Sequence, residues 1–256
     1  MTVSASMQYR VNLFDELEDA VREIAAGRAV IVVDDEHREN EGDLIMAAEM
    51  ATPEALGFFI RYTGGVVCAP MPAERADLLG LPLMTSANED EKQTAFTVTV
   101  DAVAGVVSGI SAADRAATLR TLAGAGTTAG DLQRPGHVFP LRAHPGGLAE
   151  RQGHTEAGVE LMRLAGLSPV AVISEVCHDN GSVMRLHDLR VFADTHGLKL
   201  ISIDQLIAAA TRPVSATARP VSAAARPESA ATHPESAAAR PESAAAHPES
   251  DVIVPA

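Results

Sequence analysis

Polar and apolar residues alternate along positions 12–210 with two different periods, one typical of helices and the other of strands. Between residues 12 and 27 apolar side chains recur every three or four positions, which predicts a helix with Asn12 as N-cap and Gly27 as C-cap. The continuous apolar run AVIVV at residues 29–33 then predicts a buried strand. A helix followed directly by a buried strand is typical of α/β proteins.

The same two patterns return along the rest of this region. Further helices are predicted from Pro53 to about Tyr62, from the capping box of Ser111 and Asp114 to Leu122, and at residues 154–166, 187–197 and 204–210. Further strands are predicted at residues 43–48, 64–69, 95–102, 137–143 (interrupted at Pro140), 169–176 and 198–202. Because helices separate several continuously apolar strands, the pattern predicts an α/β fold, a three-layer α/β/α sandwich around a mixed or mostly parallel central sheet.

A repeat of seven residues begins after residue 211. Residues 212–256 read RPVSATA, RPVSAAA, RPESAAT and so on, with a proline in every repeat. A period of seven also occurs in coiled coils, but proline in a helix interior costs about 3 kcal/mol, and the repeat has no pair of large apolar residues. We therefore predict a single domain at residues 1–211 and a disordered Pro/Ala/Ser tail at 212–256. The alternative is a docking segment for a partner.

Composition narrows the class of protein. The 256 residues carry a formal net charge of −14, which argues against a nucleic-acid or anionic-membrane surface. The two cysteines, Cys68 and Cys177, are too few for a disulfide framework or a zinc cluster and favour a reducing compartment. The first residues lack the apolar core of a signal peptide, and the least polar stretch, residues 102–113, is too short to cross a bilayer. We expect a cytoplasmic protein.

The first candidate site directly follows the strand at 29–33. Its sequence, VDDEHRENEGD at residues 33–43, holds six carboxylates: Asp34, Asp35, Glu36, Glu39, Glu41 and Asp43. Taken alone, such a run is most often a solvated charged turn. This run, however, lies against a buried strand, and Asn40 and Gly42 allow turns that bring side chains together. Carboxylates gathered in this way suit Mg²⁺, and those that bind no metal can act as acid or base.

A second candidate lies at a loop-to-helix junction, residues 150–158 (ERQGHTEAG). Free backbone N–H groups and the helix dipole attract a phosphate at such a junction, and Arg151 and Thr155 add a charge and a donor. The alternative is an ordinary helix start capped near His154 or Thr155, and the residues fit both equally well. The zinc-protease motif is excluded because position 158 is glycine.

Three single residues complete the candidates. His137 follows Pro135 and Gly136 at the start of a strand, and Glu175 ends the apolar run AVIS. Ligands collect at strand ends in α/β sheets, and a buried glutamate is uncommon unless paired, so a functional role is favoured for Glu175. Structural roles are the alternative for both residues. Cys68 fits a packed core thiol better than a site residue.

Seven stretches of the chain resemble one enzyme family in order, from about Leu13 to Ile207. They are DDEHRENEGDLIMAAE, TGGVVCAPM, TAFTVTVDA, GISAADRAATL, RPGHVFPLRA, RQGHTEAGVELMRLAG and AVISEVCHDNGSVMR. The family is that of the 3,4-dihydroxy-2-butanone-4-phosphate synthases of riboflavin biosynthesis. The resemblance implies a carbon–carbon lyase that converts D-ribulose 5-phosphate to 3,4-dihydroxy-2-butanone 4-phosphate plus formate. It also implies Mg²⁺ (or Mn²⁺) as cofactor, an α/β/α fold, and a homodimer whose active sites lie close to the subunit interface.

The resemblance further implies a role for each matching residue. Glu39 and His154 match the metal ligands, and His137 and Glu175 match residues needed for catalysis. The residues that match substrate contacts are Arg38, Glu39, Asp43, Arg151, Gln152, Gly153, His154, Thr155 and Glu175. The remaining acids, Asp35, Glu36 and Glu41, are available for proton transfers whose assignment stays open.

The chain departs from the family pattern at two places, and one activity is expected to be missing. Gln152 stands where the family often has glycine, and Val107 and Ser108 stand in a place often rich in threonine. We expect activity to survive both departures. In many bacteria the synthase is fused to GTP cyclohydrolase II, which carries a three-cysteine zinc site. Because this chain has only two cysteines, we predict no GTP cyclohydrolase II activity.

The residues alone permit two other functions. Acids and a histidine around Mg²⁺ would also serve a metal-dependent hydrolase of small phosphates. The same fold could form a non-catalytic binder of sugar phosphates or nucleotides. On the synthase hypothesis the partners are D-ribulose 5-phosphate and a second copy of the chain, with neither a nucleic acid nor a membrane.

Overall fold

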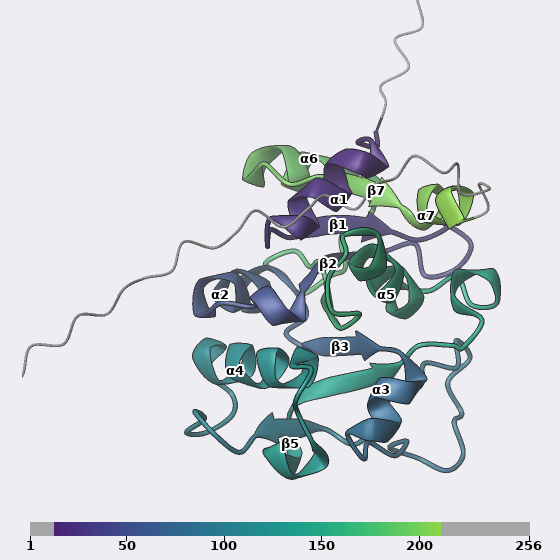
Figure 1. The fold of residues 1–256 in the computed structure, drawn as a ribbon. Helices are drawn as coiled ribbons and strands as arrows, with labels where there is room; N and C mark the ends of the chain where they lie inside the picture. Colours follow the sequence, from purple (N-terminus) through teal and green to yellow (C-terminus); the bar gives the residue numbers. More distant parts are fainter. Residues whose placement is uncertain (1–12, 211–256) are drawn as a thin grey trace, which may run out of the picture. The chain divides into compact units, whose positions relative to one another are not determined.

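The computed structural model describes residues 13–210, whose fold is drawn in Figure 1. The tail predicted at 212–256 and the N-cap predicted at Asn12 lie outside the described residues. Within them, seven strands form one sheet in the order β4-β5-β3-β6-β2-β1-β7. The strands are β1 (Val30–Val33), β2 (Gly42–Ala47), β3 (Cys68–Met71), β4 (Val100–Ala102), β5 (Leu132–Arg142), β6 (Ala171–Glu175) and β7 (Leu200–Ser202).

Helices connect most of these strands. They are α1 (Leu17–Ala25), α2 (Pro53–Tyr62), α3 (Ala73–Leu78), α4 (Ala112–Ala123), α5 (His154–Leu164), α6 (Leu186–His196) and α7 (Ile203–Ala210), with short 3₁₀ turns η1 (Ala48–Met50), η2 (Ala129–Asp131) and η3 (Gly147–Ala149). No helix within residues 13–210 is both long enough and apolar enough to cross a bilayer.

The sheet is mixed, as predicted. Strand β1 runs parallel to β7, and β3 runs parallel to β5. The pairs β1–β2, β2–β6, β3–β6 and β4–β5 are antiparallel. The antiparallel β2 lies between β1 and β6, so the loop after β1 and the end of β6 meet at one end of the sheet.

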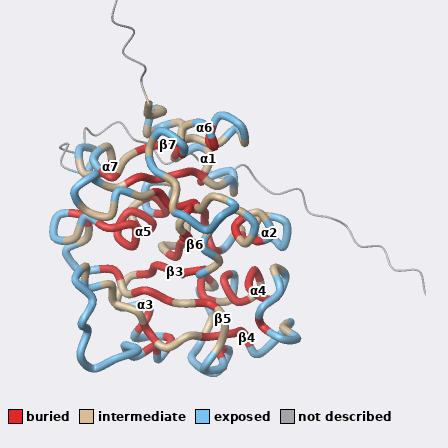
Figure 2. The backbone as a smooth tube through the Cα atoms, turned by 180° about the vertical axis from the view of Figure 1, so that it is seen from behind, coloured by how far each residue is buried: buried red, intermediate tan, exposed pale blue. Residues whose placement is uncertain are grey.

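Both faces of the sheet are covered, which confirms the three-layer sandwich. Val30 and Val32 of β1 join a core with α1, α5 and α7, whereas Ile31 and Val33 join a second core with α2, α4 and α6. Figure 1 shows α2 and α4 on one side of the strands and α5 and α7 on the other. The strands between them are largely buried (Figure 2). Burying each such side chain contributes about 1.5–3 kcal/mol.

Several predicted helix ends are confirmed by their local contacts. The Thr52 hydroxyl accepts a hydrogen bond from the Ala55 N–H at 3.2 Å, and α2 begins at Pro53. Gly27, after α1, has φ of 78°, and Gly166, after α5, has φ of 72°. Glycine adopts this left-handed conformation without steric cost, which explains why both helices end there.

The first helix starts later than the sequence indicated. It begins at Leu17, and Asp15 before it is bonded to β7 instead, since the Asp15 N–H donates to the Leu200 carbonyl at 2.8 Å. Leu13, which fits the apolar spacing, therefore lies outside the helix. A contact with a strand nearly two hundred residues away overrode the local pattern.

The strand predictions need three corrections. The strand predicted at 64–69 forms later, as β3, and only Val100–Ala102 of the predicted strand 95–102 forms one. Strand β5 begins at Leu132 and runs through Pro140 without interruption. Proline has no N–H to donate, but its carbonyl is still bonded here. The Pro140 carbonyl accepts from both the N–H and the hydroxyl of Thr97.

Two further differences concern helices. The short helix α3 has no counterpart among the predicted elements. At the start of α4 the Ser111 hydroxyl accepts from the Asp114 N–H at 3.0 Å, which is half of the predicted capping box. The Asp114 carboxylate does not complete it, because it accepts from the N–H groups of Val107, Ser108 and Gly109 instead.

Candidate active site

The loop between β1 and β2 is organised by Asp34, whose side chain is fully buried. One carboxylate oxygen accepts from the Glu39 N–H at 3.1 Å and from Arg38 at 2.9 Å. The other oxygen accepts from the Glu41 N–H at 2.9 Å. Asn40 has φ of 55°, as its predicted place in a turn requires. Asp34 therefore folds the loop back on itself and holds Glu39 and Glu41 over the strand ends.

Gly42 was expected to allow a turn, but it has a different structural role. It lies in β2, where a Cβ atom would come within 2.6 Å of the Leu189 side chain on α6. Its small size serves the packing of α6 on the sheet and not the turn.

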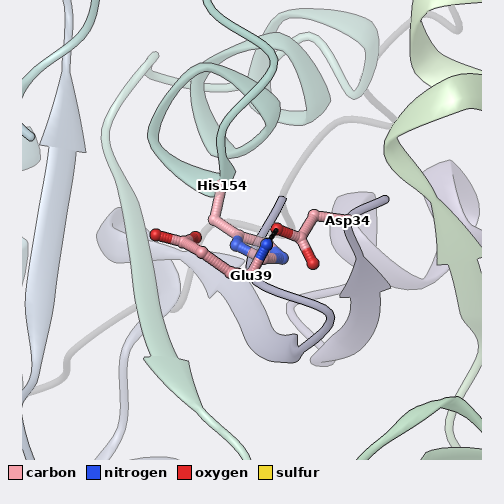
Figure 3. A group of neighbouring side chains, drawn as sticks. All are labelled: Asp34, Glu39 and His154. Atoms are coloured by element: carbon pink, nitrogen blue, oxygen red, sulfur yellow. Dashed lines mark hydrogen bonds between the residues drawn. The ribbon is translucent and has the colours of Figure 1, made fainter. Parts of the chain in front are cut away.

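His154 enters the same space from the start of α5, as Figure 3 shows. It is 5% exposed, and its Nε2 lies 3.1 Å from the Val32 carbonyl. A carbonyl only accepts, so Nε2 carries the proton and Nδ1 keeps its lone pair. Burial lowers the pKa of His154 to about 4, so the ring is neutral at neutral pH.

Asp43 lies beside this imidazole. In the sheet register it pairs with Val32 of β1 and Glu175 of β6, so both acids stand at the same level. Its Oδ1 is 3.7 Å from His154 Nδ1, is buried and has no hydrogen-bond partner. A buried carboxylate oxygen without a donor is costly unless a cation or a ligand meets it.

Among residues 13–210, two groups of three side chains could hold a metal ion, and they share His154. One is Asp34, Glu39 and His154, and the other is Glu41, Asp43 and His154; within each group the ligand atoms lie within 4.8 Å of one another. Figure 3 shows the first group. Arg38 donates to both Asp34 and Glu39, so its guanidinium group compensates part of the negative charge of this first group.

The crowded acids hold protons more tightly than usual. Burial, with help from Glu39 and Glu175, raises the pKa of Glu41 to about 7. Burial also raises the pKa of Asp43 well above its usual range, and burial and Glu39 raise that of Glu175. Glu41, which titrates near neutral pH, can both accept and donate protons.

A cavity brings most of the predicted site residues together. Its lining includes seven of them, namely Arg38, Glu39, Asp43, Arg151, His154, Thr155 and Glu175. Glu41, Cys68 and Thr94 also line it. Cys68 is thus both a core residue and a cavity residue, and burial raises its thiol pKa well above the usual value. Asp35 and Glu36 are exposed and are not among the lining residues.

Two cationic side chains meet at the first turn of α5. A Cβ atom on Gly153 would come within 2.4 Å of Arg151 Nη1 and 2.9 Å of Arg38 Nη2, so both guanidinium groups lie against this backbone. The first helical N–H groups have no partner within the helix. Together they make an anion-binding corner at the cavity wall. Gln152 is exposed and borders a separate surface hollow with Lys92 and Asp204.

Arg151 is held in place by three groups. Its Nη1 donates to the buried Glu156 carboxylate at 2.6 Å, its Nη2 to the Thr94 hydroxyl at 3.1 Å, and its Nε to the Lys92 carbonyl at 3.2 Å. The other Glu156 oxygen accepts from the His144 N–H at 2.8 Å. Each guanidinium nitrogen Nη keeps one further hydrogen for a ligand.

His137 does not line this cavity within the described chain. It lies on β5, which β3 separates from β6 in the sheet, and its Nδ1 is 2.7 Å from the Asp101 carboxylate. The structure thus gathers the acidic loop, the α5 junction and Glu175, but it leaves His137 with a separate partner.

Sequence reasoning missed three residues: Asp34 as the organiser of the loop, Glu156 as the partner of Arg151, and Asp101 as the partner of His137. A signal existed for two of them. Asp34 is the first residue after a buried strand, and Asp101 is a charged residue near the end of an alternating apolar one. Glu156 resembled an ordinary first-turn acid, because Arg151 approaches it only in the folded loop.

The family model and the similar known sequences indicate the same enzyme family. The family model for 3,4-dihydroxy-2-butanone 4-phosphate synthase matches residues 18–209. The riboflavin biosynthesis protein RibBA of Nocardia farcinica is 59% identical over 197 residues, which is 76% of this chain and 48% of that protein. RibBA of Salinispora arenicola is 55% identical over 199 residues, 78% of this chain and 47% of that protein. The chain therefore spans about half the length of these relatives.

Solved structures agree with this family. A crystal structure of 3,4-dihydroxy-2-butanone 4-phosphate synthase in complex with two magnesium ions is 45% identical, with a TM-score of 0.74, over 77% of this chain and 97% of that one. The enzyme of Candida albicans is 48% identical, with a TM-score of 0.73, over 78% of this chain and 100% of that one.

Proposed function

Because the chain belongs to the 3,4-dihydroxy-2-butanone 4-phosphate synthase family, we propose that it converts D-ribulose 5-phosphate to 3,4-dihydroxy-2-butanone 4-phosphate and formate. The reaction makes it a carbon–carbon lyase of riboflavin biosynthesis. The observation that carries the proposal is the cavity, in which paired carboxylates and a neutral imidazole lie beside an anion-binding corner. A sugar phosphate matches both parts of this cavity. Its hydroxyl and carbonyl oxygens fit the carboxylates and the imidazole, and its dianionic phosphate fits the anion-binding corner.

The residues fit a divalent metal. The buried Asp43 Oδ1 lacks a donor, and the neighbouring ligand atoms are carboxylate oxygens and one imidazole nitrogen with a free lone pair. Oxygen ligands with one imidazole suit Mg²⁺ or Mn²⁺. Glu39 and His154 would hold the ion, and the relative solved with two magnesium ions supports this choice. When bound, the metal polarises oxygens of the substrate and lowers the cost of charge that develops on them.

The substrate phosphate is proposed to bind at the start of α5. The N–H groups of residues 154 and 155, with Arg151 and Arg38, offer donors and positive charge to it. Gly153 permits this approach because a side chain there would meet both guanidinium groups. Glu39, Asp43 and Glu175 then face the sugar hydroxyls, and Gln152 contributes through its backbone alone.

Proton transfers are assigned to acids inside the cavity. The reaction begins with enolisation, for which a base takes the proton beside the carbonyl, and the later dehydration and carbon shift return protons. Glu41 and Glu175 have raised pKa values and line the cavity, which favours them over the exposed Asp35 and Glu36. His137 keeps its catalytic assignment as part of this proposal, and a homodimer is the assembly that we propose.

The test is incubation with D-ribulose 5-phosphate and Mg²⁺, with formate and inorganic phosphate measured in parallel. Formate release at the rate of substrate loss supports the lyase. Phosphate release without formate would instead identify a hydrolase, and tight binding without either product would identify a binding module. Either of those two results overturns the proposal.

A second part of the proposal concerns what this chain does not do. GTP cyclohydrolase II carries a three-cysteine zinc site, and the two cysteines of this sequence, Cys68 and Cys177, cannot supply three thiolates. Cys68 is, in addition, buried in the synthase cavity. We expect no turnover of GTP when zinc is supplied, and measurable turnover would contradict this. The cytoplasmic location and the absence of a nucleic-acid partner remain predictions.

A further inference from the structure

The turn of the acidic loop at Asn40 is held from outside the loop. Asn40 has φ of 55°, a left-handed conformation that few residues other than glycine adopt. The two peptide groups that flank its Cα atom carry the carbonyls of Glu39 and Asn40. Both carbonyls accept from Nη1 of Arg185, the Glu39 carbonyl at 2.7 Å. One guanidinium nitrogen therefore joins the two peptide groups that meet at this turn.

Arg185 lies directly before α6, and its backbone is anchored on both sides. The preceding residue, Met184, donates its N–H to the Val176 carbonyl at 2.9 Å, which ties this segment to the chain just after β6. On the other side the Arg185 carbonyl accepts from the Leu189 N–H at 2.9 Å, and Leu189 is buried against Gly42 of β2. The guanidinium group thus reaches the acidic loop from a fixed base.

The backbone of Glu39 is consequently held on both sides. Its N–H donates to the buried Asp34 carboxylate at 3.1 Å, and its carbonyl accepts from Arg185. The Glu39 carboxylate, which lies with His154 in one of the candidate metal groups, therefore extends from a backbone whose two peptide groups are both bonded. A ligand held in this way loses little conformational freedom when a metal ion binds.

Arg185 differs from Arg38, the arginine within the loop. Arg38 binds the carboxylates of Asp34 and Glu39, whereas Arg185 binds backbone carbonyls and is not among the residues that line the cavity. A cation near a metal site repels the ion, so the charge of Arg185 by itself would weaken Mg²⁺ binding. The two carbonyl bonds would strengthen it. The sign of the effect on Mg²⁺ binding therefore separates the two roles.

We propose that Arg185 is the positioning residue of the metal ligand Glu39: by binding the two carbonyls at the turn, it keeps the acidic loop in the conformation that receives the ion. The inference rests on the proposed function, in which Glu39 and His154 hold a divalent metal. It assigns no contact between Arg185 and either the metal or the substrate.

Hydrogen exchange of metal-free protein gives the first test. Arg185→Met removes the donor and keeps an apolar side chain. The amides of Glu39 and Glu41, which are bonded to Asp34, should exchange their hydrogens about tenfold faster or more in this variant than in the wild type. The amide of Ala55, bonded at the start of α2, is the internal reference and should not change. NMR spectra resolve these amides one by one.

Calorimetry of Mg²⁺ binding gives the second test. Groups that orient a metal ligand typically contribute 10–100-fold to metal affinity, so Kd for Mg²⁺ should rise by about tenfold or more in Arg185→Met. Arg185→Lys keeps the charge and a donor on a shorter chain, and its Kd should lie between that of Arg185→Met and that of the wild type. At saturating Mg²⁺, kcat for formate release in Arg185→Met should return to within about threefold of wild type, because the reacting groups are intact.

Arg22→Met is the matched control. Arg22 is an exposed arginine that pairs with Asp19 within α1, so the exchange rates of the loop amides and Kd for Mg²⁺ should both equal those of the wild type.

Two results overturn the inference. One is a Kd for Mg²⁺ in Arg185→Met that is unchanged or lower than in the wild type; a lower Kd would show that Arg185 acts through its charge alone. The other is exchange of the Glu39 and Glu41 amides within about twofold of the wild-type rate. If Arg185→Met does not fold, Arg185→Gln, whose side chain is too short to reach the carbonyls, decides by the same two measurements. Neither measurement depends on turnover, so a wild type that releases no formate refutes the proposed reaction and leaves this test intact.

Discussion

His154 and His137 are held in opposite ways. His154 is buried at the start of α5 and donates from Nε2 to the Val32 carbonyl, which leaves the Nδ1 lone pair free beside Asp43. His137 lies on a bulge of β5 with its side chain partly exposed, and it donates from Nδ1 to Asp101, which leaves Nε2 free. The two rings therefore present different nitrogens to their surroundings.

The difference teaches what each ring can do. A metal ligand must be neutral with a fixed lone pair, and burial serves this by lowering the pKa of His154 to about 4. A group that exchanges protons needs access from outside. The His137 ring is partly exposed, and its Nδ1 is occupied by the Asp101 carboxylate. The predictions below test whether this division between the two histidines holds.

The largest effect is expected for His154→Ala. Loss of this ligand should reduce Mg²⁺-dependent formate release by about 10³-fold, because a bound metal supplies several kcal/mol and each 1.36 kcal/mol is tenfold in rate. His187→Ala is the matched control, since that side chain is 89% exposed. Circular dichroism checks that the fold is intact. Full activity of His154→Ala would remove it from the metal site.

His137→Gln should lower kcat by about 10²-fold, the contribution of a single acid or base. Mg²⁺ binding, measured by calorimetry, should stay as in the wild type, because His137 does not line the metal cavity. If Mg²⁺ affinity falls together with kcat, the two histidines are not separated in the way that the structure indicates.

Mg²⁺ itself should stabilise the fold. At a concentration one hundred times Kd, binding adds about 2.7 kcal/mol to the free energy of unfolding, or roughly 5–10 °C in Tm for a domain of this size. Glu39→Gln should abolish the shift, and His137→Gln should retain it. Thermal unfolding with Mg²⁺ and with a chelator measures both. A shift that survives in Glu39→Gln would exclude Glu39 as a ligand.

Asp114→Asn should have the smallest effect on turnover, a fall in kcat of less than about tenfold, since it loosens residues 107–109, where Gly109 lies against Asp101 and His137, without touching either. Burial raises the pKa of Asp114, but hydrogen bonds from the N–H groups of Ser108 and Val107 outweigh it and hold the pKa below its usual value.

This shift gives Asp114→Asn a pH signature in stability. A carboxyl whose folded pKa is lowered stabilises the protein above its usual value of 3.8, and that contribution is lost as the pH falls through the folded pKa. Urea midpoints of wild type and variant should therefore differ at pH 7 and converge as the pH falls below 3.8 and through the lowered pKa of Asp114. A difference that persists at the lower pH would mean that the charge of Asp114 is not what fixes the loop.

Local patterns predicted most of the fold. The apolar run of β1, the start of α2 at Pro53 and the glycines that end α1 and α5 depend on neighbours within a few residues, so the sequence was sufficient. The errors arose at contacts over long distances. Asp15 is bonded to Leu200 where α1 was expected, and Phe96 and Thr97 form only isolated bridges in the strand expected at 95–102.

The candidate site divides in the same way. Residue type and position at strand and helix ends indicated the acidic loop, the junction at 150–158 and Glu175. The family resemblance then selected Glu39, Asp43 and His154 among them, and the fold brings these residues to one cavity. The sequence did not identify Asp34 or Glu156, whose roles are to hold a loop and an arginine. A supporting side chain is recognised only by its partner, and the partner is brought to it by tertiary contacts.

The sequence by itself determined the alternation of helices and strands, the acidic loop after a buried strand and the presence of two candidate histidines. Those features follow from side-chain periodicity and local capping, which depend only on residues close together in the sequence. Only the tertiary structure decided which nitrogen each histidine presents. That choice belongs to the Val32 carbonyl and the Asp101 carboxylate, acceptors 122 and 36 residues away along the chain, and no local pattern encodes them.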